Sequence, residues 1–103
     1  MIIINFETKN DKIEKMEAKG HANYSQFGSD IVCSAVSAVI GGAINNLECE
    51  HKYKFDDPGY ALIEMIGKVN YHDQCVLETM YVQLKSIEVN YGDYVKVIVY
   101  ERN

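Results

Sequence analysis

His21 and Cys33 are the two residues of this chain whose types and spacing best suit chemistry. The histidine ends a run with the pattern of a strand, and the cysteine falls in the first turn of an expected helix. A cysteine attacks a carbonyl carbon as its thiolate, which forms when a base takes the proton and a positive local field stabilises the charge. The imidazole can supply the base and the helix N-terminus the field. The pair therefore favours nucleophilic catalysis, although Cys33 alone also suits a small core residue and His21 alone a surface side chain.

Two polar residues near the start of this helix could support such a site. Asp30 lies three residues before Cys33. It could orient His21 or a substrate amide, or it could cap the helix; its charge would oppose thiolate formation. Ser37 could line a substrate pocket or hydrogen-bond back to the helix backbone. The first-turn backbone amides near Cys33 are candidates for stabilising the oxyanion of an intermediate.

Tyr24 and Phe27 are the aromatic residues of the segment between the histidine and the cysteine. Residues 22–29 are expected to form a loop in which these rings stand among small and polar residues. An apolar substrate could dock against the rings as the loop closes, and a loose surface loop is the alternative. Both residues are therefore candidates for substrate binding.

Hydrophobic periodicity and turn signals predict the elements that position these residues. Five strands are expected, over residues 2–8, 12–20, 52–55, 60–68 and 94–101. The first two strands flank Lys9-Asn10-Asp11 and the next two flank Asp56-Asp57-Pro58-Gly59, so each pair should form a hairpin. We predict an α+β fold in the order ββαββαβ, a two-layer sandwich of a mostly antiparallel sheet with both helices on one side. The last strand should pair with a strand of the N-terminal region.

Two helices are expected between these strands. The first is capped by Ser29 or Asp30 and carries an apolar stripe between unusually small residues. Gly41-Gly42 costs this helix roughly 1 kcal/mol per residue relative to alanine, so packing on more than one side must offset the loss. The second helix opens at residue 72 or 73. Its apolar stripe consists of Leu77, Met80, Leu84, Ile87 and Tyr91.

The composition indicates one soluble domain over residues 1–103. The chain has 103 residues, of which 48% are hydrophobic and 24% charged, as expected for one globular core. A net charge of -5 without a basic patch argues against nucleic-acid binding and is compatible with a basic partner. No apolar run is long enough to span a membrane. Three cysteines at irregular spacings indicate a reducing compartment, so we expect a cytoplasmic protein.

Two short clusters contain metal-binding residue types, Cys49-Glu50-His51 and His72-Asp73-Gln74-Cys75. Neither has a recognised zinc spacing, and the sequence has no glycine-rich phosphate loop. We therefore expect neither a metal ion nor a cofactor. Cys49 and Cys75 are expected in the core or at helix ends.

The segment from residue 20 to residue 37 carries the densest motif in the chain: Gly20-His21-Ala22, Gly28, Asp30-Ile31-Val32-Cys33 and Ser37. It resembles the signature of the bacterial ribosomal-processing cysteine proteases, the Prp family, and length and element order agree over essentially the whole chain. The resemblance implies a single cysteine protease domain with a Cys-His dyad, Cys33 and His21. Ser34 departs from the family pattern, in which alanine is commoner, and this puts the fine shape of the pocket in doubt.

The resemblance also implies a function. Similar family members are cytoplasmic homodimers that remove a short N-terminal extension from large-subunit ribosomal protein twenty-seven, which supports ribosome assembly. We therefore expect a cysteine endopeptidase, a hydrolase, whose peptide substrate is such an extension. One alternative is a non-catalytic dimeric module that binds a ribosomal protein or the assembling ribosome. Another is a thiol redox protein that uses Cys33, although no resolving cysteine lies close to it in sequence.

Overall fold

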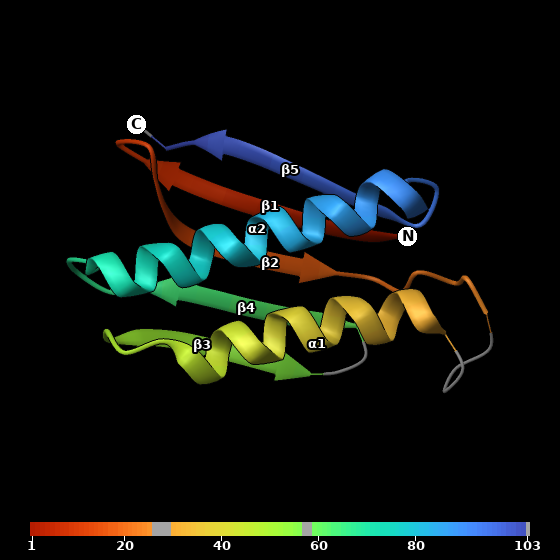
Figure 1. Ribbon diagram of the computed structural model, residues 1–103, viewed down its shortest axis with the longest axis horizontal. Helices are drawn as coiled ribbons and strands as arrows, with labels where there is room; N and C mark the ends of the chain where they lie inside the picture. Colours follow the sequence, from red (N-terminus) through yellow and green to blue (C-terminus); the bar gives the residue numbers. More distant parts are fainter. Residues whose placement is uncertain (26–29, 57–58, 103) are drawn as a thin grey trace.

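The computed structural model describes residues 1–25, 30–56 and 59–102, and these contain five strands and two helices. Their order is ββαββαβ, as the sequence predicts (Figure 1). The elements are β1 (Ile2–Lys9), β2 (Lys12–Lys19), α1 (Ile31–Asn46), β3 (His51–Asp56), β4 (Tyr60–Met65), α2 (Tyr71–Tyr91) and β5 (Val95–Glu101).

The strands of the described chain form one sheet in the order β3-β4-β2-β1-β5. The pairs β1–β2, β2–β4 and β3–β4 are antiparallel, whereas β1 and β5 are parallel. Both predicted hairpins are therefore confirmed, and so is the pairing of the last strand with the N-terminal strand. The strand order could not be predicted, because it depends on where the hairpins and the crossover through α2 meet in space.

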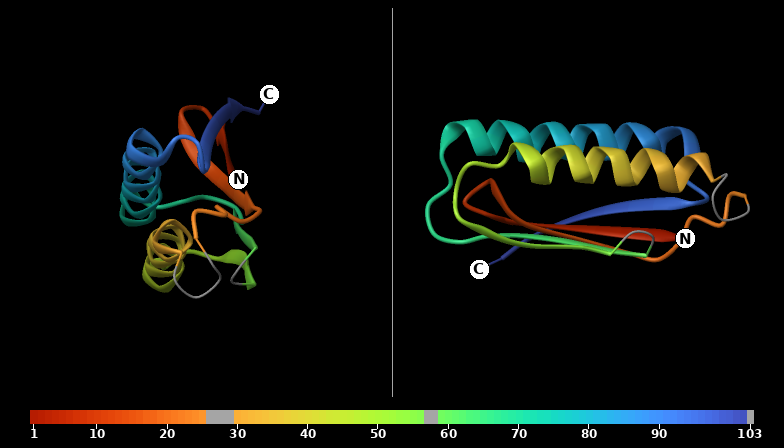
Figure 2. Two further views of the ribbon diagram at one scale, coloured as in Figure 1. Left: turned by 90° about the vertical axis from the view of Figure 1, so that its right-hand side faces the viewer. Right: turned by 90° about the horizontal axis from the view of Figure 1, so that it is seen from below.

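Both helices lie side by side on one face of this sheet, so the fold is the predicted two-layer sandwich (Figure 2). Alternation along the strands explains which face the helices cover. Ile4 and Phe6 of β1 are fully buried, and their neighbours Asn5 and Glu7 are only partly buried on the opposite, open face. Each fully buried apolar side chain contributes about 1.5–3 kcal/mol to the stability of the fold. Burial of this stripe therefore fixes which face of β1 points toward the helices.

The helices cover the sheet with the stripes that the sequence predicts. Val32, Val36 and Ile40 of α1 are buried, and Gly42 on the same helix is exposed. The predicted stripe of α2 is buried at Leu77, Met80 and Leu84 and packs partly against the core at Ile87 and Tyr91. Over the described residues, no helix combines the length and the apolarity that a membrane span needs.

Strands β1, β2, β3 and β5 begin and end within one residue of the sequence expectation, whereas the end of β4 and the start of α2 have a specific local cause for their difference. β4 ends at Met65 rather than at residue 68, because the chain turns at Gly67, whose φ of 74° suits glycine. α2 begins at Tyr71, one or two residues earlier than expected. Asn70 is the cap, and its side-chain oxygen accepts a hydrogen bond from the Asp73 amide at 2.8 Å.

The two glycines in the middle of α1 have different surroundings. A Cβ atom on Gly41 would lie 3.1 Å from Cε2 of Phe55, so this glycine lets the ring of β3 approach the helix closely. A Cβ atom on Gly42 would meet nothing within 4 Å. The packing that offsets the helix cost is therefore confined to Gly41.

Gly42→Ala should stabilise the protein by about 0.5–1 kcal/mol, because it removes the helix penalty of glycine without a new contact. Gly41→Ala is the matched control and should gain less or lose stability, because Phe55 must move. Urea unfolding at several protein concentrations measures both free energies of unfolding. Equal effects of the two substitutions would contradict this account.

Candidate active site

The connection between β2 and α1 brings the two sequence-predicted residues of the dyad to the same end of the sandwich. His21 follows β2 and is exposed, whereas Cys33 is the third residue of α1 and is half-buried. The amide of Ala22, the residue after His21, donates a hydrogen bond to Sγ of Cys33 at 3.4 Å. The sulfur therefore lies directly beside the segment that carries the histidine. All three cysteines of the chain are thiols rather than disulfides.

Asp30 joins the start of the helix to the preceding loop. Its Oδ1 accepts hydrogen bonds from the amides of Val32 and Cys33, both at 3.0 Å, and its Oδ2 accepts one from the Tyr24 amide at 3.0 Å. Asp30 is therefore the helix cap, one of the two roles that the sequence allowed. These partners of its carboxylate are backbone amides and do not include the ring of His21.

The Asp30 carboxylate stays charged although it is only 6% exposed. Burial raises the pKa of Asp30, but the backbone amides of Cys33, Tyr24, Ser25 and Val32 together outweigh burial and hold this pKa below its usual value. A negative charge next to the sulfur opposes thiolate formation, as the sequence analysis anticipated. Other groups must therefore offset it.

The amides of Val32, Cys33 and Ser34 in the first turn are already engaged, which corrects for these three the expectation that they stabilise an oxyanion. The amides of Val32 and Cys33 donate to the Asp30 side chain, and the amide of Ser34 donates to the Asp30 carbonyl oxygen at 3.1 Å. From the sequence, the cap and the oxyanion donors are two separate possibilities. The structure shows that the cap uses the same amides.

Gly59, the residue before β4, lies against the ring of His21. A Cβ atom on Gly59 would lie 3.3 Å from both Cε1 and Nε2 of the His21 ring, and Gly59 has a φ of 120°. The Gly20 amide also donates to the Gly59 carbonyl oxygen at 3.0 Å. Gly59 thus touches the segment that carries the histidine. The sequence showed it only as part of a turn, because nothing in the chain order links it to residue 21.

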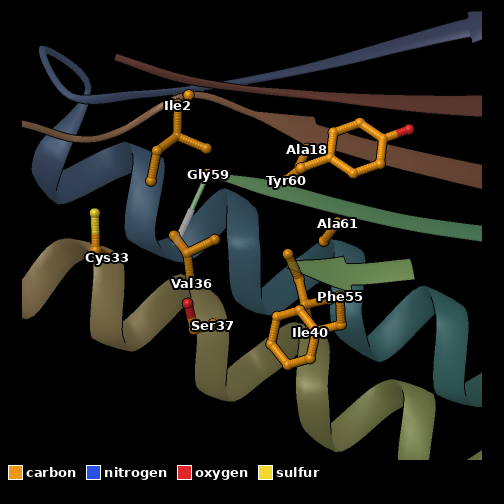
Figure 3. A pocket seen from close by; sticks show the side chains of 11 residues that line it. Ile2, Ala18, Cys33, Val36, Ser37, Ile40, Phe55, Gly59, Tyr60 and Ala61 are labelled. Atoms are coloured by element: carbon orange, nitrogen blue, oxygen red, sulfur yellow. The ribbon is translucent and has the colours of Figure 1, made fainter. Parts of the chain in front are cut away.

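A small cavity of about 30 Å³ lies between α1 and the sheet, beside Cys33 (Figure 3). Its wall is apolar, and Ser37, Gly59 and Tyr60 also lie along it. The apolar wall comprises Ile2, Ala18, Val36, Ile40, Phe55 and Ala61. Ser37 therefore takes the pocket-lining position that the sequence analysis allowed. The contributions of Ile2 and Phe55 were missed, because both come from strands remote in sequence.

The other predicted site residues have different places. The ring of Tyr24 packs edge-on against Tyr91 at 5.6 Å and Tyr94 at 5.1 Å between centroids, although 42% of its surface is exposed. Phe27 lies outside the described residues. Ser34 is exposed, does not line the cavity, and donates its hydroxyl to the Asp30 carbonyl oxygen at 3.0 Å. The departure from the family pattern at Ser34 therefore leaves the pocket wall unchanged.

One cluster of potential metal ligands, Glu48, His72 and Asp73, lies within the described residues at the start of α2, with its ligand atoms within 4.8 Å of one another. Asp73 is fully buried, and its carboxylate accepts hydrogen bonds from the amides of Glu48 and Cys49 at 2.7–3.1 Å. It also contacts Nδ1 of His72 at 2.8 Å. These contacts use the carboxylate to hold the corner between α1 and β3, so we assign it a structural role.

Comparisons with known proteins relate this chain to one family of cysteine proteases. A family model described as cysteine protease Prp matches residues 1–96. A ribosomal processing cysteine protease Prp from Staphylococcus aureus (strain Mu50 / ATCC 700699) is 34% identical over 97 residues, which cover 87% of this chain and 92% of the relative. The protein of the same description from Bacillus subtilis (strain 168) is 32% identical over 107 residues, which cover 94% of this chain and 96% of the relative.

Solved structures share the whole fold. The S. aureus ribosomal processing protease Prp in complex with a covalently linked product peptide matches with a TM-score of 0.91 and 28% identity, over 97% of this chain and 100% of that one. The same protease in complex with a substrate peptide matches with a TM-score of 0.84 and 27% identity, over the same shares. Fold and family together define a cysteine peptidase. The chain belongs to the Prp family of cysteine proteases.

Asp30→Ser should lower peptide cleavage by about 10- to 100-fold, because serine can cap the helix but is too short to hold the Tyr24 amide as well. The free energy of unfolding should fall by only about 1 kcal/mol. Ser34→Ala is the matched control, since it removes a bond to the Asp30 carbonyl and leaves the carboxylate intact. Steady-state cleavage and urea unfolding measure the two effects. Cleavage by Asp30→Ser at the wild-type rate would show that the hydrogen bond between Asp30 and the Tyr24 amide is not needed for activity.

Asp73→Asn should destabilise the protein by about 2 kcal/mol near neutral pH. Burial raises the pKa of Asp73, but the His72 contact and the amides of Cys49 and Glu48 outweigh it and lower this pKa from 3.8 to about 2. A lowered pKa contributes stability that is complete above the unfolded value and is lost as pH falls from about 4 to about 2. Urea unfolding from pH 7 to pH 3 should therefore show the difference from wild type shrinking at the acid end. A difference independent of pH would contradict the assignment.

Proposed function

We propose that this protein is a cysteine endopeptidase in which Cys33 is the nucleophile and His21 the general base. The observation that carries the proposal is the position of the Cys33 sulfur. It lies between the His21 segment and an apolar cavity, on a fold shared with a protease that holds a covalently linked product peptide. Cys33 is half-buried and His21 is exposed, and the amide that follows His21 binds the Cys33 sulfur, so an extended peptide could reach the thiol and the base could approach it from the same segment.

The reaction proceeds through an acyl-enzyme. His21 takes the thiol proton of Cys33, and the thiolate attacks the carbonyl carbon of the scissile bond. The carbon–nitrogen bond then breaks as protonated His21 gives its proton to the leaving amine. Water, deprotonated by the same imidazole, then attacks the thioester. The carbon–sulfur bond breaks, the carboxyl product leaves, and the Cys33 thiolate takes the proton back from His21.

The proposed substrate is the N-terminal extension of large-subunit ribosomal protein twenty-seven. Two features of this chain support a substrate of that kind. The cavity of about 30 Å³ beside Cys33 can receive only a small apolar group of a substrate along its apolar wall, and the net charge of -5 suits a basic partner. The relatives from S. aureus and B. subtilis are described as ribosomal processing proteases.

The proposal includes a homodimer in the cytoplasm. Both parts come from the resemblance to the family, and the three cysteines, which are thiols and not disulfides, are compatible with a reducing compartment. No metal ion or cofactor takes part in the proposed steps.

Cys33→Ala and His21→Ala should each abolish cleavage of a peptide that spans the extended terminus of the ribosomal protein from the same organism. We expect a loss of about 10³-fold or more, because the nucleophile and the base act as one unit. Cys33→Ala should still bind the peptide, which fluorescence anisotropy measures. Cys49→Ala and Cys75→Ala are matched controls and should cleave as the wild type does.

The other outcomes are equally decisive. Cleavage by Cys33→Ala at the wild-type rate would exclude this nucleophile. Peptide binding by the wild type without cleavage would favour the non-catalytic interaction module. Alkylation of the three thiols against pH adds a second measurement, in which Cys33 should react faster than Cys49 and Cys75.

A further inference from the structure

We propose that the backbone N–H of Ala22 is the donor that stabilises the oxyanion in the reaction of Cys33. This inference rests on the proposed function, since it assigns a group to the same acyl transfer. The amides nearest the sulfur at the start of α1 are the usual candidates for stabilising an oxyanion. In this protein the amides of Val32, Cys33 and Ser34 have other partners.

Three first-turn amides are held by Asp30. Those of Val32 and Cys33 bind its carboxylate and that of Ser34 binds its carbonyl oxygen. Turning the amide of Val32 or Cys33 toward a substrate would remove a donor from a buried charge, and turning that of Ser34 would break the first hydrogen bond of the helix. Buried carboxylates lose stability steeply when their donors leave, so these bonds persist through the reaction.

The Ala22 amide is placed differently. It already points at the sulfur, with 3.4 Å between the nitrogen and Sγ, and Ala22 is only 2% exposed. The oxygen of a tetrahedral intermediate is separated from the sulfur only by the carbonyl carbon. A donor that reaches the sulfur at rest is therefore within reach of that oxygen once the bond to carbon forms. Once His21 has taken the thiol proton, the same N–H also stabilises the thiolate before it attacks.

The segment that carries this amide is fixed on both sides. Before it, the Gly20 amide binds the Gly59 carbonyl oxygen at 3.0 Å. After it, the Tyr24 amide binds Asp30 at 3.0 Å and the Tyr24 ring packs on Tyr91 and Tyr94. A donor held before the reaction starts needs no reorganisation during it, which is the condition for strong stabilisation of developing charge.

His21 and the Ala22 amide belong to adjacent residues, so one short segment supplies the base through a side chain and the oxyanion donor through the backbone. Placement of this segment against α1 thus sets both functions together. The sequence motif Gly20-His21-Ala22 then has a physical reason beyond the histidine: the residue after it must present its amide to the sulfur.

Replacement of the Ala22 amide by an ester tests the inference, because an ester keeps the side chain and removes the N–H. Synthetic residues 1–32, with lactic acid at position 22 and a C-terminal thioester, can be ligated to residues 33–103, which begin with Cys33. The matched control carries an ester at Ile31, which belongs to the first turn. Ligated protein without an ester controls for the synthesis, and urea unfolding checks that each product folds.

The ester at Ala22 should lower kcat by about 10²–10³-fold with little change in KM, which is the usual effect of removing one oxyanion donor. It should also shift alkylation of Cys33 to higher pH. The ester at Ile31 should leave both nearly unchanged. Full kcat with the Ala22 ester would overturn the inference, and cleavage by the unmodified ligated protein would still uphold the proposed function. Absence of cleavage by the unmodified protein would instead overturn both.

A second measurement needs no altered backbone. A peptide aldehyde reacts with the thiol to give a tetrahedral hemithioacetal whose oxygen occupies the oxyanion position. In protein labelled with ¹⁵N-alanine, the Ala22 amide proton should move downfield when the aldehyde is added to the wild type and stay in place in Cys33→Ala. An Ala22 resonance that does not respond in the wild type, with the adduct confirmed by mass, would overturn the inference.

Discussion

The buried carboxylate of Asp30 is the interaction on which the site depends. It binds the amides of Val32 and Cys33 at the start of α1 and the amide of Tyr24 in the preceding loop. A buried charge is tolerated only when several donors compensate it, so the helix start and the loop must meet around this side chain. Because the helix start and the loop are held together around Asp30, the Ala22 amide lies against the sulfur of Cys33.

This constraint changes the usual account of a thiol at a helix N-terminus. The helix dipole corresponds to roughly half a positive charge at its N-terminus, and Asp30 places a full negative charge at the same point. The field of the capped helix therefore does not favour a thiolate at Cys33. The proton acceptor His21 and the Ala22 amide must supply what the helix does not. The position of Cys33 serves mainly to aim its sulfur at the cavity.

Much of the fold follows from local patterns. The alternation of Ile2, Ile4 and Phe6, the turn residues between strands and the spacing of Leu77, Met80 and Leu84 predict the element order and both layers, because each reports burial on one face of its own element. The boundaries of β4 and α2 were less accurate. Gly67 ends β4 through its positive φ, and Asn70 starts α2 through a side-chain hydrogen bond. Hydrophobic periodicity contains no information on either feature.

The sequence by itself determined the identity of the candidate pair His21 and Cys33 and restricted the helix cap to Ser29 or Asp30, because these depend on residue types and short spacings. Only the tertiary structure decided which backbone amides remain available as donors for catalysis and which side chains line the cavity beside the sulfur. Gly59 reaches His21, and Ile2 and Phe55 reach the cavity, across the strand order of the sheet. That order follows from the joint packing of all the elements, and no short stretch of the chain encodes it.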